Sequence, residues 1–456
     1  MLLVTTSCMS GGANERSVFV DFSHDEFSSF MISNFPNEVS VTPGDSVVFK
    51  QVWTGEPHTV TGGTLVNELM EKASNFIPFF ESFETLAATE ADIPNPEAPT
   101  GSLADVFDAI GASDDEENRE KFFDAYDGLV EDGSELPPRD DPGNVTFEKA
   151  VEIIDEESNE IFEAEGIPWA LDEDEKGNGF VTQNAGQPCF LDSGGPPKDA
   201  DEPCKEADQR QPAFDGKATY YNSGIIPYEG PQGNTFKVDL TEDIDPGSYF
   251  FYCAVHGPSQ YTEVKVVEAG ERIPDAEAVN RQAREEIETF AEPMLKAFRD
   301  ARDGEIEVDG ETIEGPFAGL SSEAHGSINE FVPETIETEV GEPVTWKMMG
   351  SDHTISFDVP EYFPIIRFAD NGKVSLNSRL QPPAGGSPDI PEQEGAEDGK
   401  GILEVDGGTY AGDGFFSSGL FGGEPYATYT LRFSEPGTYK YACLLHPPMV
   451  GTVEVT

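Results

Sequence analysis

The sequence predicts a mainly β protein built from two tandem β-domains with helical additions, and three observations support this fold class. Alternating apolar runs, as at residues 46–52 and 438–443, have the two-residue period of half-buried strands. Turn-forming Pro-Gly pairs separate such runs. The same order of strands and turns occurs twice along the 456-residue chain, which indicates an internal duplication of one β-domain.

The upstream parts of the two copies match from a proline to a histidine. Residues 30–36 lead into a strand at 38–41 and a glycine turn, and residues 327–333 lead into 335–340 and a similar turn. Eight positions separate proline from turn glycine in each copy, and each copy ends in His-Thr followed by a β-branched residue. The matched positions are Pro36, Gly44 and His58 in the first copy and Pro333, Gly341 and His353 in the second.

The downstream parts of the copies match as well. Residues 222–226 correspond to 417–421, and residues 246–256 correspond to 436–446. The second pair of segments carries a Cys-x2-His motif in both copies, at the end of a predicted strand. One duplicated β-domain explains all of these correspondences.

The repeats and the segments between them set the expected domain boundaries. We expect an N-terminal tail or lipobox remnant at 1–16, a first β-domain at 17–268 with a helical insertion at about 64–215, a helical linker at 269–322, and a second β-domain at 323–456 with a loop insertion at about 357–408. The linker helix should begin at Pro274-Asp275, with Pro293 kinking or ending its first part. Residues 304–320 are expected to form a short strand pair or a loop.

Two apolar stripes at helical spacing predict the helices of the first insertion. They consist of Phe122, Phe123, Tyr126, Leu129 and Val130, and of Phe147, Val151, Ile154, Ile161 and Phe162. We expect both stripes to be packing faces against the β-domain rather than cofactor-binding surfaces.

The chain is strongly acidic, with 89 Asp and Glu against 27 Lys and Arg, a net charge of -62 and a pI near 4.1. Disorder is disfavoured because 32 Phe and 13 Tyr can bury enough area to fold. Acid spread along the whole chain instead indicates a halophilic, haloarchaeal protein, since the Debye length falls to about 3 Å at 1 M salt. Such a surface excludes nucleic acid as a partner, because binding phosphates requires basic patches.

The N-terminus and two cysteines bear on the compartment. Cys8, before a Gly/Ser-rich stretch, resembles a truncated lipobox whose Cys becomes lipidated, although an ordinary frayed terminus is the alternative. No run of 18 apolar residues exists, so we expect no membrane-spanning helix. Cys189 and Cys204 share one polar loop without a nearby His, which favours a disulfide and an extracytoplasmic location over two unpaired thiols.

The C-terminal loop carries the strongest chemical signal. Cys443, His446 and Met449 lie between two predicted strands, and His353 arrives from a separate strand end. Thiolate and thioether suit Cu(I), imidazole suits both copper oxidation states, and Cys, two His and a weak axial Met are the ligands of a blue-copper site. We therefore predict a copper site from these four residues, against the alternative of a core thiol beside an unrelated His.

Three segments of the second copy carry a family resemblance. They are Val344-Thr345-Trp346 after a glycine turn, Asp352-His353-Thr354, and residues 437–449 with Cys443-Leu444-Leu445-His446-Pro447-Pro448-Met449. These segments resemble the plastocyanin, amicyanin and halocyanin members of the cupredoxin family. The resemblance implies Greek-key β-sandwiches with type 1 copper. It also implies an outer edge of His446 near the surface, ringed by Leu445, Pro447 and Pro448, where electrons enter or leave.

The first copy predicts a second copper site from His58, Cys253, His256 and Gln260. Gln260 takes the place of Met449 across a loop one residue longer. Gln is an accepted axial ligand of blue copper, and its amide oxygen should favour Cu(II) and lower the potential. The alternative is a decayed domain kept for packing.

These sites predict an electron carrier without bond-making chemistry of its own. We expect it to pass single electrons between redox proteins of a membrane electron-transport chain, secreted or anchored to the outer face of the membrane. A nitrite reductase or multicopper oxidase needs further His clusters, commonly beside the type 1 Cys, where Tyr252 and Ala442 stand here. His24 and His325 are too few to supply them within one chain. A copper-binding interaction protein that docks through the helical insertion is the third interpretation.

Overall fold

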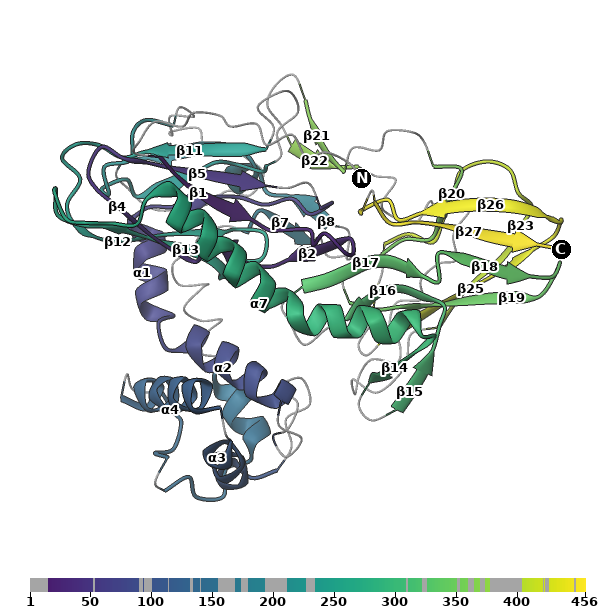
Figure 1. Cartoon of the computed structure of the whole chain (residues 1–456), viewed down its shortest axis with the longest axis horizontal. Helices are drawn as coiled ribbons and strands as arrows, with labels where there is room; N and C mark the ends of the chain where they lie inside the picture. Colours follow the sequence, from purple (N-terminus) through teal and green to yellow (C-terminus); the bar gives the residue numbers. More distant parts are fainter. Residues whose placement is uncertain are drawn as a thin grey trace.

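Two β-sandwiches dominate the fold and follow one another along the long axis of the molecule (Figure 1). The mainly β class with helical parts is confirmed. The computed structural model describes residues 15–51, 54–89, 93, 101–113, 115–131, 134–139, 141–154, 169–173, 179–192, 211–226, 234–308, 311–321, 326–350, 353–359, 365–369, 374–377, 404–420, 422, 426–446 and 448–456.

The first sandwich consists of two sheets. One has the strand order β11 (Thr235–Asp239), β5 (Ser46–Gln51), β1 (Glu15–Val20) and β3 (Asn34–Phe35). The other has the order β4 (Glu38–Val41), β13 (Gly257–Val266), β12 (Gly247–Cys253), β6 (Thr61–Gly62), β10 (Tyr220–Asn222) and β9 (Cys189–Leu191). Alternating burial on β11, with Phe236 and Val238 inside, follows from the two-residue strand period.

The second sandwich again has two sheets. One runs β2 (Ser29–Met31), β17 (Gly326–Val332), β16 (Phe317–Ser321), β19 (Pro343–Met348), β25 (Ala427–Phe433) and β23 (Glu404–Tyr410). The other runs β18 (Thr335–Thr338), β27 (Val450–Val455), β26 (Gly437–Ala442), β20 (Ser356–Phe357) and β24 (Phe416–Ser417). β16 therefore belongs to this sandwich, although it lies before the expected domain start at residue 323.

The two sandwiches share one strand order. The order β11-β5-β1-β3 of the first equals β25-β19-β16-β17 of the second, and β4-β13-β12-β6-β10 equals β18-β27-β26-β20-β24. The mixed pairings agree too, since β1 is parallel to β5 as β16 is to β19, and β13 to β4 as β27 to β18. Equal topology lets positions in the two sandwiches be compared one by one.

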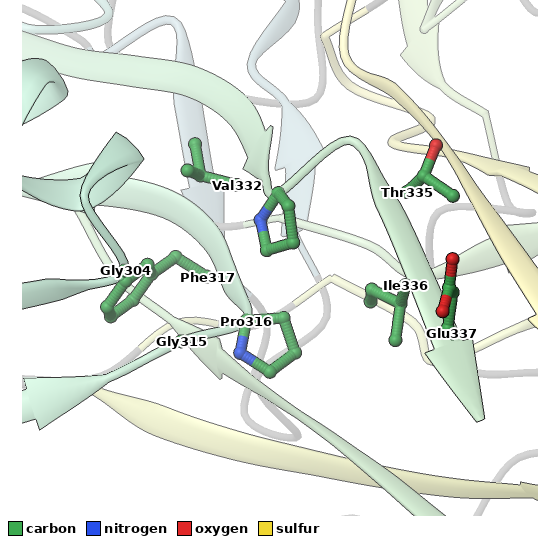
Figure 2. A pocket seen from close by; sticks show the side chains of 9 residues that line it. Gly304, Gly315, Pro316, Phe317, Val332, Thr335, Ile336 and Glu337 are labelled. Carbon is green, nitrogen blue, oxygen red and sulfur yellow. The ribbon is translucent and has the colours of Figure 1, made fainter.

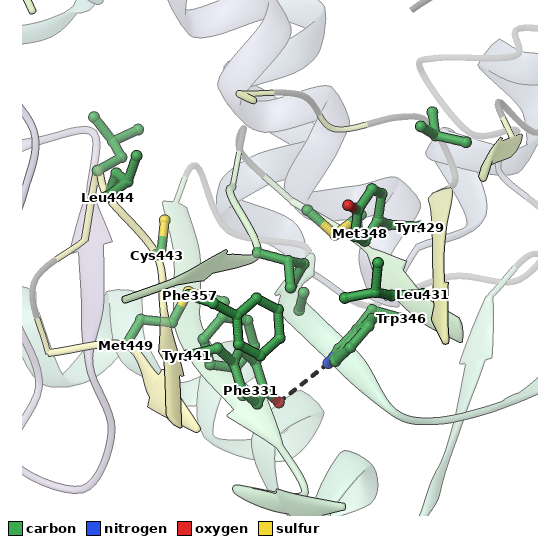
Figure 3. Close-up of a cluster of buried hydrophobic side chains, with 14 of the residues drawn as sticks. Phe331, Trp346, Met348, Phe357, Tyr429, Leu431, Tyr441, Cys443, Leu444 and Met449 are labelled. Carbon is green, nitrogen blue, oxygen red and sulfur yellow. Dashed lines mark hydrogen bonds between the residues drawn. The ribbon is translucent and has the colours of Figure 1, made fainter. Parts of the chain in front are cut away.

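The hydrophobic core of the second sandwich includes side chains of the Cys443 loop (Figure 3). Trp346 is fully buried, and its indole Nε1 donates a 3.1 Å hydrogen bond to the Tyr441 hydroxyl, which satisfies both polar groups. The Tyr441 ring lies 4.4 Å from the Phe331 ring. Cys443 and Met449 belong to the same cluster of buried side chains. The loop is thus held on a rigid, dry support.

The sandwiches are joined by strand pairing and a shared core. β2 comes from the N-terminal segment, yet it pairs antiparallel with β17, with Phe30 opposite Ser327. Helix α7 (Ala276–Arg302) buries one face against both sandwiches (Figure 1). Their shared core includes Phe27, Met31 and Phe35 from the first segment, Ala283, Ile287 and Met294 from α7, and Phe317, Leu320 and Ile328 from the second sandwich.

Pro293 lies inside helix α7, so of the two expected outcomes, a kink or an end of the first part of the helix, the end does not occur. Asp275 caps the helix, accepting a 2.9 Å bond from the Ala278 amide, and Pro293 lies inside one continuous helix instead of ending it. Proline removes one donor from the ladder, and the packing of Ile287, Ala291 and Met294 on both sides of it supplies compensating burial.

The insertion of the first sandwich also differs from expectation. α1 (Thr64–Lys72) packs on the sandwich, with Val66 and Met70 against Tyr252. α2 (Phe76–Thr89), α3 (Leu103–Ala112) and α4 (Glu116–Glu131) instead form a separate core that includes Phe122, Tyr126, Phe147 and Ile154 (Figure 1). The stripes pack against other helices and not against the β-domain, because their many rings suffice for a core of their own. Ile161 and Phe162 lie outside the described residues.

Short elements complete the fold. β14 (Glu305–Val308) and β15 (Glu311–Glu314) form the expected strand pair after α7. β7 (Leu171–Glu173) pairs with β8 (Gly179–Val181), followed by α6 (Gln183–Gly186). The segment 357–408, predicted mainly as loop, includes the hairpin of β21 (Ile366–Phe368) and β22 (Val374–Leu376), and most of β23. Within the described residues, no helix combines the length and apolar character needed to cross a membrane.

A hollow of about 280 Å³ is lined by apolar side chains including Phe317, Val332 and Ile336, with Glu337 at its edge (Figure 2). Cys189 is disulfide-bonded. Cys204 and Cys8 lie outside the described residues, so the predicted pairing of Cys189 and the predicted lipidation stay predictions.

Candidate metal centres

The downstream site, defined here as His353, Cys443, His446 and Met449, lies at one end of the second sandwich. His446 Nδ1 is 3.6 Å from Cys443 Sγ and 3.1 Å from His353 Nδ1. The loop is closed by backbone hydrogen bonds, from the Cys443 amide to the Met449 carbonyl (3.0 Å) and from the Met449 amide to the His446 carbonyl (2.9 Å). All four side chains are buried.

The upstream site, defined here as His58, Cys253, His256 and Gln260, has the same arrangement. Cys253 Sγ is 3.7 Å from His58 Nδ1 and 3.6 Å from His256 Nδ1. Gln260 is fully buried on β13, and its Oε1 lies 3.2 Å and 3.0 Å from those two nitrogens. The structure therefore brings the amide oxygen of Gln260 to the three other predicted ligands.

The donor sets fit the metal that the residue types predict. In each group the thiol sulfur and one nitrogen of each imidazole lie within 4.8 Å of one another. Two imidazoles and a thiolate, with a thioether or amide oxygen as fourth donor, are the ligand set of blue copper. Their convergence does not identify the bound metal, and the assignment of these eight residues as copper ligands stays a prediction.

Matching hydrogen bonds hold both sites in place. The residue after the first His, Thr59 or Thr354, donates its amide to the cysteine sulfur at 3.4 Å in each sandwich. Its hydroxyl accepts a bond from the residue after the cysteine, from the Ala254 amide at 2.7 Å or the Leu444 amide at 2.8 Å. This explains why the His-Thr pair occurs in both copies, because threonine ties the two ligand-bearing segments together.

The electrostatics favour thiolates. Burial alone would raise the pKa of Cys253, but hydrogen bonds from His256 and His58 lower it well below the usual range. The pKa of Cys443 falls in the same way, against its burial, through His353 and His446. Conversely, despite burial, the pKa of His446 rises to about 9 beside Cys443 and Glu56. Deprotonated thiolate is the form that binds a metal.

Besides the fourth donor, the two sites differ in the residue that lies against the outer nitrogen of His58 or His353. Asp21 directly follows the last residue of β1 that pairs with β5, and Gly319 directly follows the last residue of β16 that pairs with β19. The two positions are therefore equivalent, and both have positive φ, 64° at Asp21 and 75° at Gly319. Asp21 is fully buried, and its Oδ2 lies 3.0 Å from His58 Nε2 and accepts a 2.6 Å bond from the Thr54 hydroxyl. The Asp21 hydrogen bond helps raise the pKa of His58 to about 9 against burial.

Gly319 occupies the corresponding position without a side chain. A Cβ there would lie 1.9 Å from His353 Nε2, so only glycine leaves room for this imidazole. One sandwich thus places a carboxylate behind its first His, and the other places bare backbone.

The structure corrects the expected exposure of His446. Its side chain is fully buried, and its outer nitrogen, Nε2, lies 2.8 Å from Glu56 Oε1 of the first sandwich. Pro448 is exposed and Leu445 is buried, whereas Pro447 lies outside the described residues. The His446 edge faces the other sandwich because β2 and the segment at 54–56 cover it.

Sequence reasoning missed the residues behind the predicted ligands. Glu56 and Asp21 come from loops, and no local pattern marks them. The difference between Asp21 and Gly319 could have been found by extending the repeat upstream. Phe19 and Phe317 occupy matching register positions, opposite Lys50 and Lys347, and Asp21 and Gly319 each follow two residues later. Of the other histidines, His24 stacks on Phe27 away from both groups, and His325 lies outside the described residues.

Comparisons with known proteins give partial similarity. No protein-family model matches the chain, and no curated protein matches it. Solved structures that are similar include a copper(I) form of an amicyanin variant, at 19% identity and a TM-score of 0.15, covering 28% of this chain and 73% of that one. A reduced amicyanin variant at pH 4 has 16% identity and a TM-score of 0.17, covering 33% and 91%. These TM-scores are too low to support an inference about function, so the functional proposal depends on the side chains described above.

Proposed function

We propose that this protein is a blue-copper electron carrier with one type 1 site in each sandwich. The observation that carries the proposal is the repeated convergence of a buried thiol and two imidazoles at matching positions of two sandwiches. The residues expected as fourth donors, Gln260 and Met449, also hold matching positions, each directly before the residue that pairs with the one preceding the cysteine. Chance clustering of core polar groups does not account for the same His-Cys-His arrangement twice, with the same Thr hydrogen bonds beside it.

The residues have distinct roles in this proposal. His58, Cys253, His256 and Gln260 would hold one copper, and His353, Cys443, His446 and Met449 the other. Bound copper would supply reversible one-electron chemistry. The side chains supply donors acceptable to both oxidation states, and the backbone bonds to sulfur and the closed Cys443–Met449 loop fix those donors in place. A rigid frame limits rearrangement during electron transfer.

The proposed carrier acts outside the cytoplasm and exchanges electrons with redox proteins of a membrane electron-transport chain. The predicted Cys8 lipid and Cys189–Cys204 disulfide support this location. Mass spectrometry of the protein from its native host would test both modifications. An unmodified Cys8 would argue against lipid anchoring. Free thiols at both Cys189 and Cys204 would argue against an oxidising compartment.

Enzymatic chemistry is a weaker candidate. Tyr252 and Ala442 stand beside the two site cysteines, where copper oxidoreductases commonly have histidine. His24 does not join either group, and the potential metal-binding clusters among the described residues are the two already assigned. Redox titration tests the carrier directly. An intense blue colour that bleaches on reduction and returns on oxidation is expected, whereas colourless copper or turnover of nitrite or oxygen would oppose the proposal.

A further inference from the structure

Glu56 lies between the two predicted metal sites. Its Oε1 is 2.8 Å from His446 Nε2, and its Oε2 is 3.8 Å from His256 Nε2. These are the outer nitrogens of two predicted ligands, since the Nδ1 atoms face the site sulfurs. The Glu56 side chain is only 11% exposed. One carboxylate therefore hydrogen-bonds the outer edge of His446 and lies within ion-pair distance of the outer edge of His256, in a largely dry interface.

The surrounding contacts close this edge from both sides. The Phe30 ring is stacked against both imidazoles, 6.4 Å from the His256 ring and 5.9 Å from the His446 ring, at interplanar angles of 24° and 17°. Gly55 has φ 111°, and a Cβ there would lie 2.3 Å from the Leu445 carbonyl oxygen. Glycine thus permits the backbone before Glu56 to approach the His446 loop closely.

The family resemblance would have His446 meet an external partner, but here another part of the chain occupies that edge. His446 is fully buried, and the His256 side chain is 13% exposed. A docking partner has no direct access to His446 while the sandwiches keep this arrangement. What faces the downstream site across the interface is the upstream site.

We propose that Glu56 is a positioning residue that bridges the two sites through His256 and His446, so that electrons pass between the sandwiches within the chain. This rests on the proposed function, since both sites must hold copper. With both sites loaded, one electron would leave the upstream Cu(I), giving Cu(II), and would reduce the downstream Cu(II) to Cu(I). No bond forms or breaks, and no proton needs to move.

The direction follows from the ligand differences. Upstream, Gln260 and the Asp21 carboxylate beside His58 both favour Cu(II). Downstream, the Glu56 carboxylate beside His446 also favours Cu(II), but Met449 as the fourth donor and the lack of a side chain at Gly319 beside His353 favour Cu(I). Electrons that reach the upstream site should therefore settle on the downstream site. Glu56 provides a short connection for this step because it is hydrogen-bonded to His446 and lies 3.8 Å from His256.

The test compares Glu56→Gln with the matched control Glu330→Gln in the full-length, copper-loaded protein. Glu330 also bonds across the interface, accepting a 2.8 Å bond from the Ser28 amide, away from the ligand imidazoles. Flash reduction would introduce one electron per chain, and the rate of its transfer between sites would be followed by absorbance. We expect Glu56→Gln to slow transfer about tenfold or more and Glu330→Gln to leave it near the wild-type rate.

Two further measurements distinguish an effect of Glu56 on the His446 imidazole from a role only in holding the two sandwiches together. In the diamagnetic Cu(I) form, the nitrogen NMR shift of His446 Nε2 should change in Glu56→Gln and stay unchanged in Glu330→Gln. Small-angle scattering should show the sandwiches still docked, since the β2–β17 pairing remains. Unchanged transfer in Glu56→Gln would overturn the proposal, and so would slowing that occurs only with separated sandwiches. A wild-type chain lacking one copper would instead refute the proposed function.

Discussion

Asp21 and Gly319 occupy the same position in the two sandwiches, and each lies against the outer nitrogen of a predicted ligand. Asp21 Oδ2 is 3.0 Å from His58 Nε2, whereas a Cβ at Gly319 would lie 1.9 Å from His353 Nε2. A carboxylate behind a ligand imidazole makes it more electron-donating. The two copies therefore share their predicted His and Cys ligands, while the residue behind one of them differs.

Asp21→Asn should raise the reduction potential of the upstream site. The amide keeps a similar shape but removes the negative charge that stabilises Cu(II) through His58. We expect a rise of about 60 mV, which corresponds to tenfold in the one-electron equilibrium. Spectroelectrochemistry of each site would measure it. The downstream potential serves as the internal control, and an unchanged upstream potential would show that Asp21 does not tune that site.

Exchanging the fourth donors should move the two potentials in opposite directions. Gln260→Met should raise the upstream potential, and Met449→Gln should lower the downstream one, because an amide oxygen favours Cu(II) more than a thioether does. The matched pair controls for loss of packing, since both side chains are fully buried and similar in length. Shifts of the same sign in both variants would contradict the assignment of Gln260 and Met449 as axial donors.

Gly319→Ala should damage the downstream site alone. The new methyl group would collide with His353 Nε2, and φ 75° strains any residue with a Cβ. Copper affinity downstream should fall about tenfold or more, while the upstream site keeps its metal. Copper titration followed by absorbance measures both. Gly341→Ala is the control, since Gly341 also has positive φ, but a Cβ placed there would meet no heavy atom within 4 Å. Equal losses in the two variants would point to backbone strain rather than to His353.

The fold class and the convergence of the predicted ligands could be predicted from the sequence because both depend on local patterns. Strand alternation, the turn glycines and the spacing from Cys443 to Met449 are all short-range signals. The repeat then links His58 and His353 to their distant cysteines. Thr59 and Thr354 appeared in that repeat, and the structure supplies the reason, a hydrogen bond between the ligand-bearing segments.

The contacts between the sandwiches could not be predicted in this way. Glu56 lies 390 positions before His446, and no periodic pattern indicates that they meet. The family resemblance even suggested the opposite, an edge of His446 near the surface. The predicted packing of the helical stripes against the β-domain was wrong for a related reason. Periodicity shows that Phe122 and Phe147 are buried, but it does not show which surface covers them.

The most direct test of two copper sites is copper per chain in wild type and in single cysteine variants. Cys253→Ser and Cys443→Ser each remove one thiolate and should keep the fold, since serine is close in size. We expect two equivalents in wild type and one in each variant, with the blue absorption of the remaining site retained. One equivalent in wild type, lost only in Cys443→Ser, would contradict the account and leave the upstream group as a structural relic.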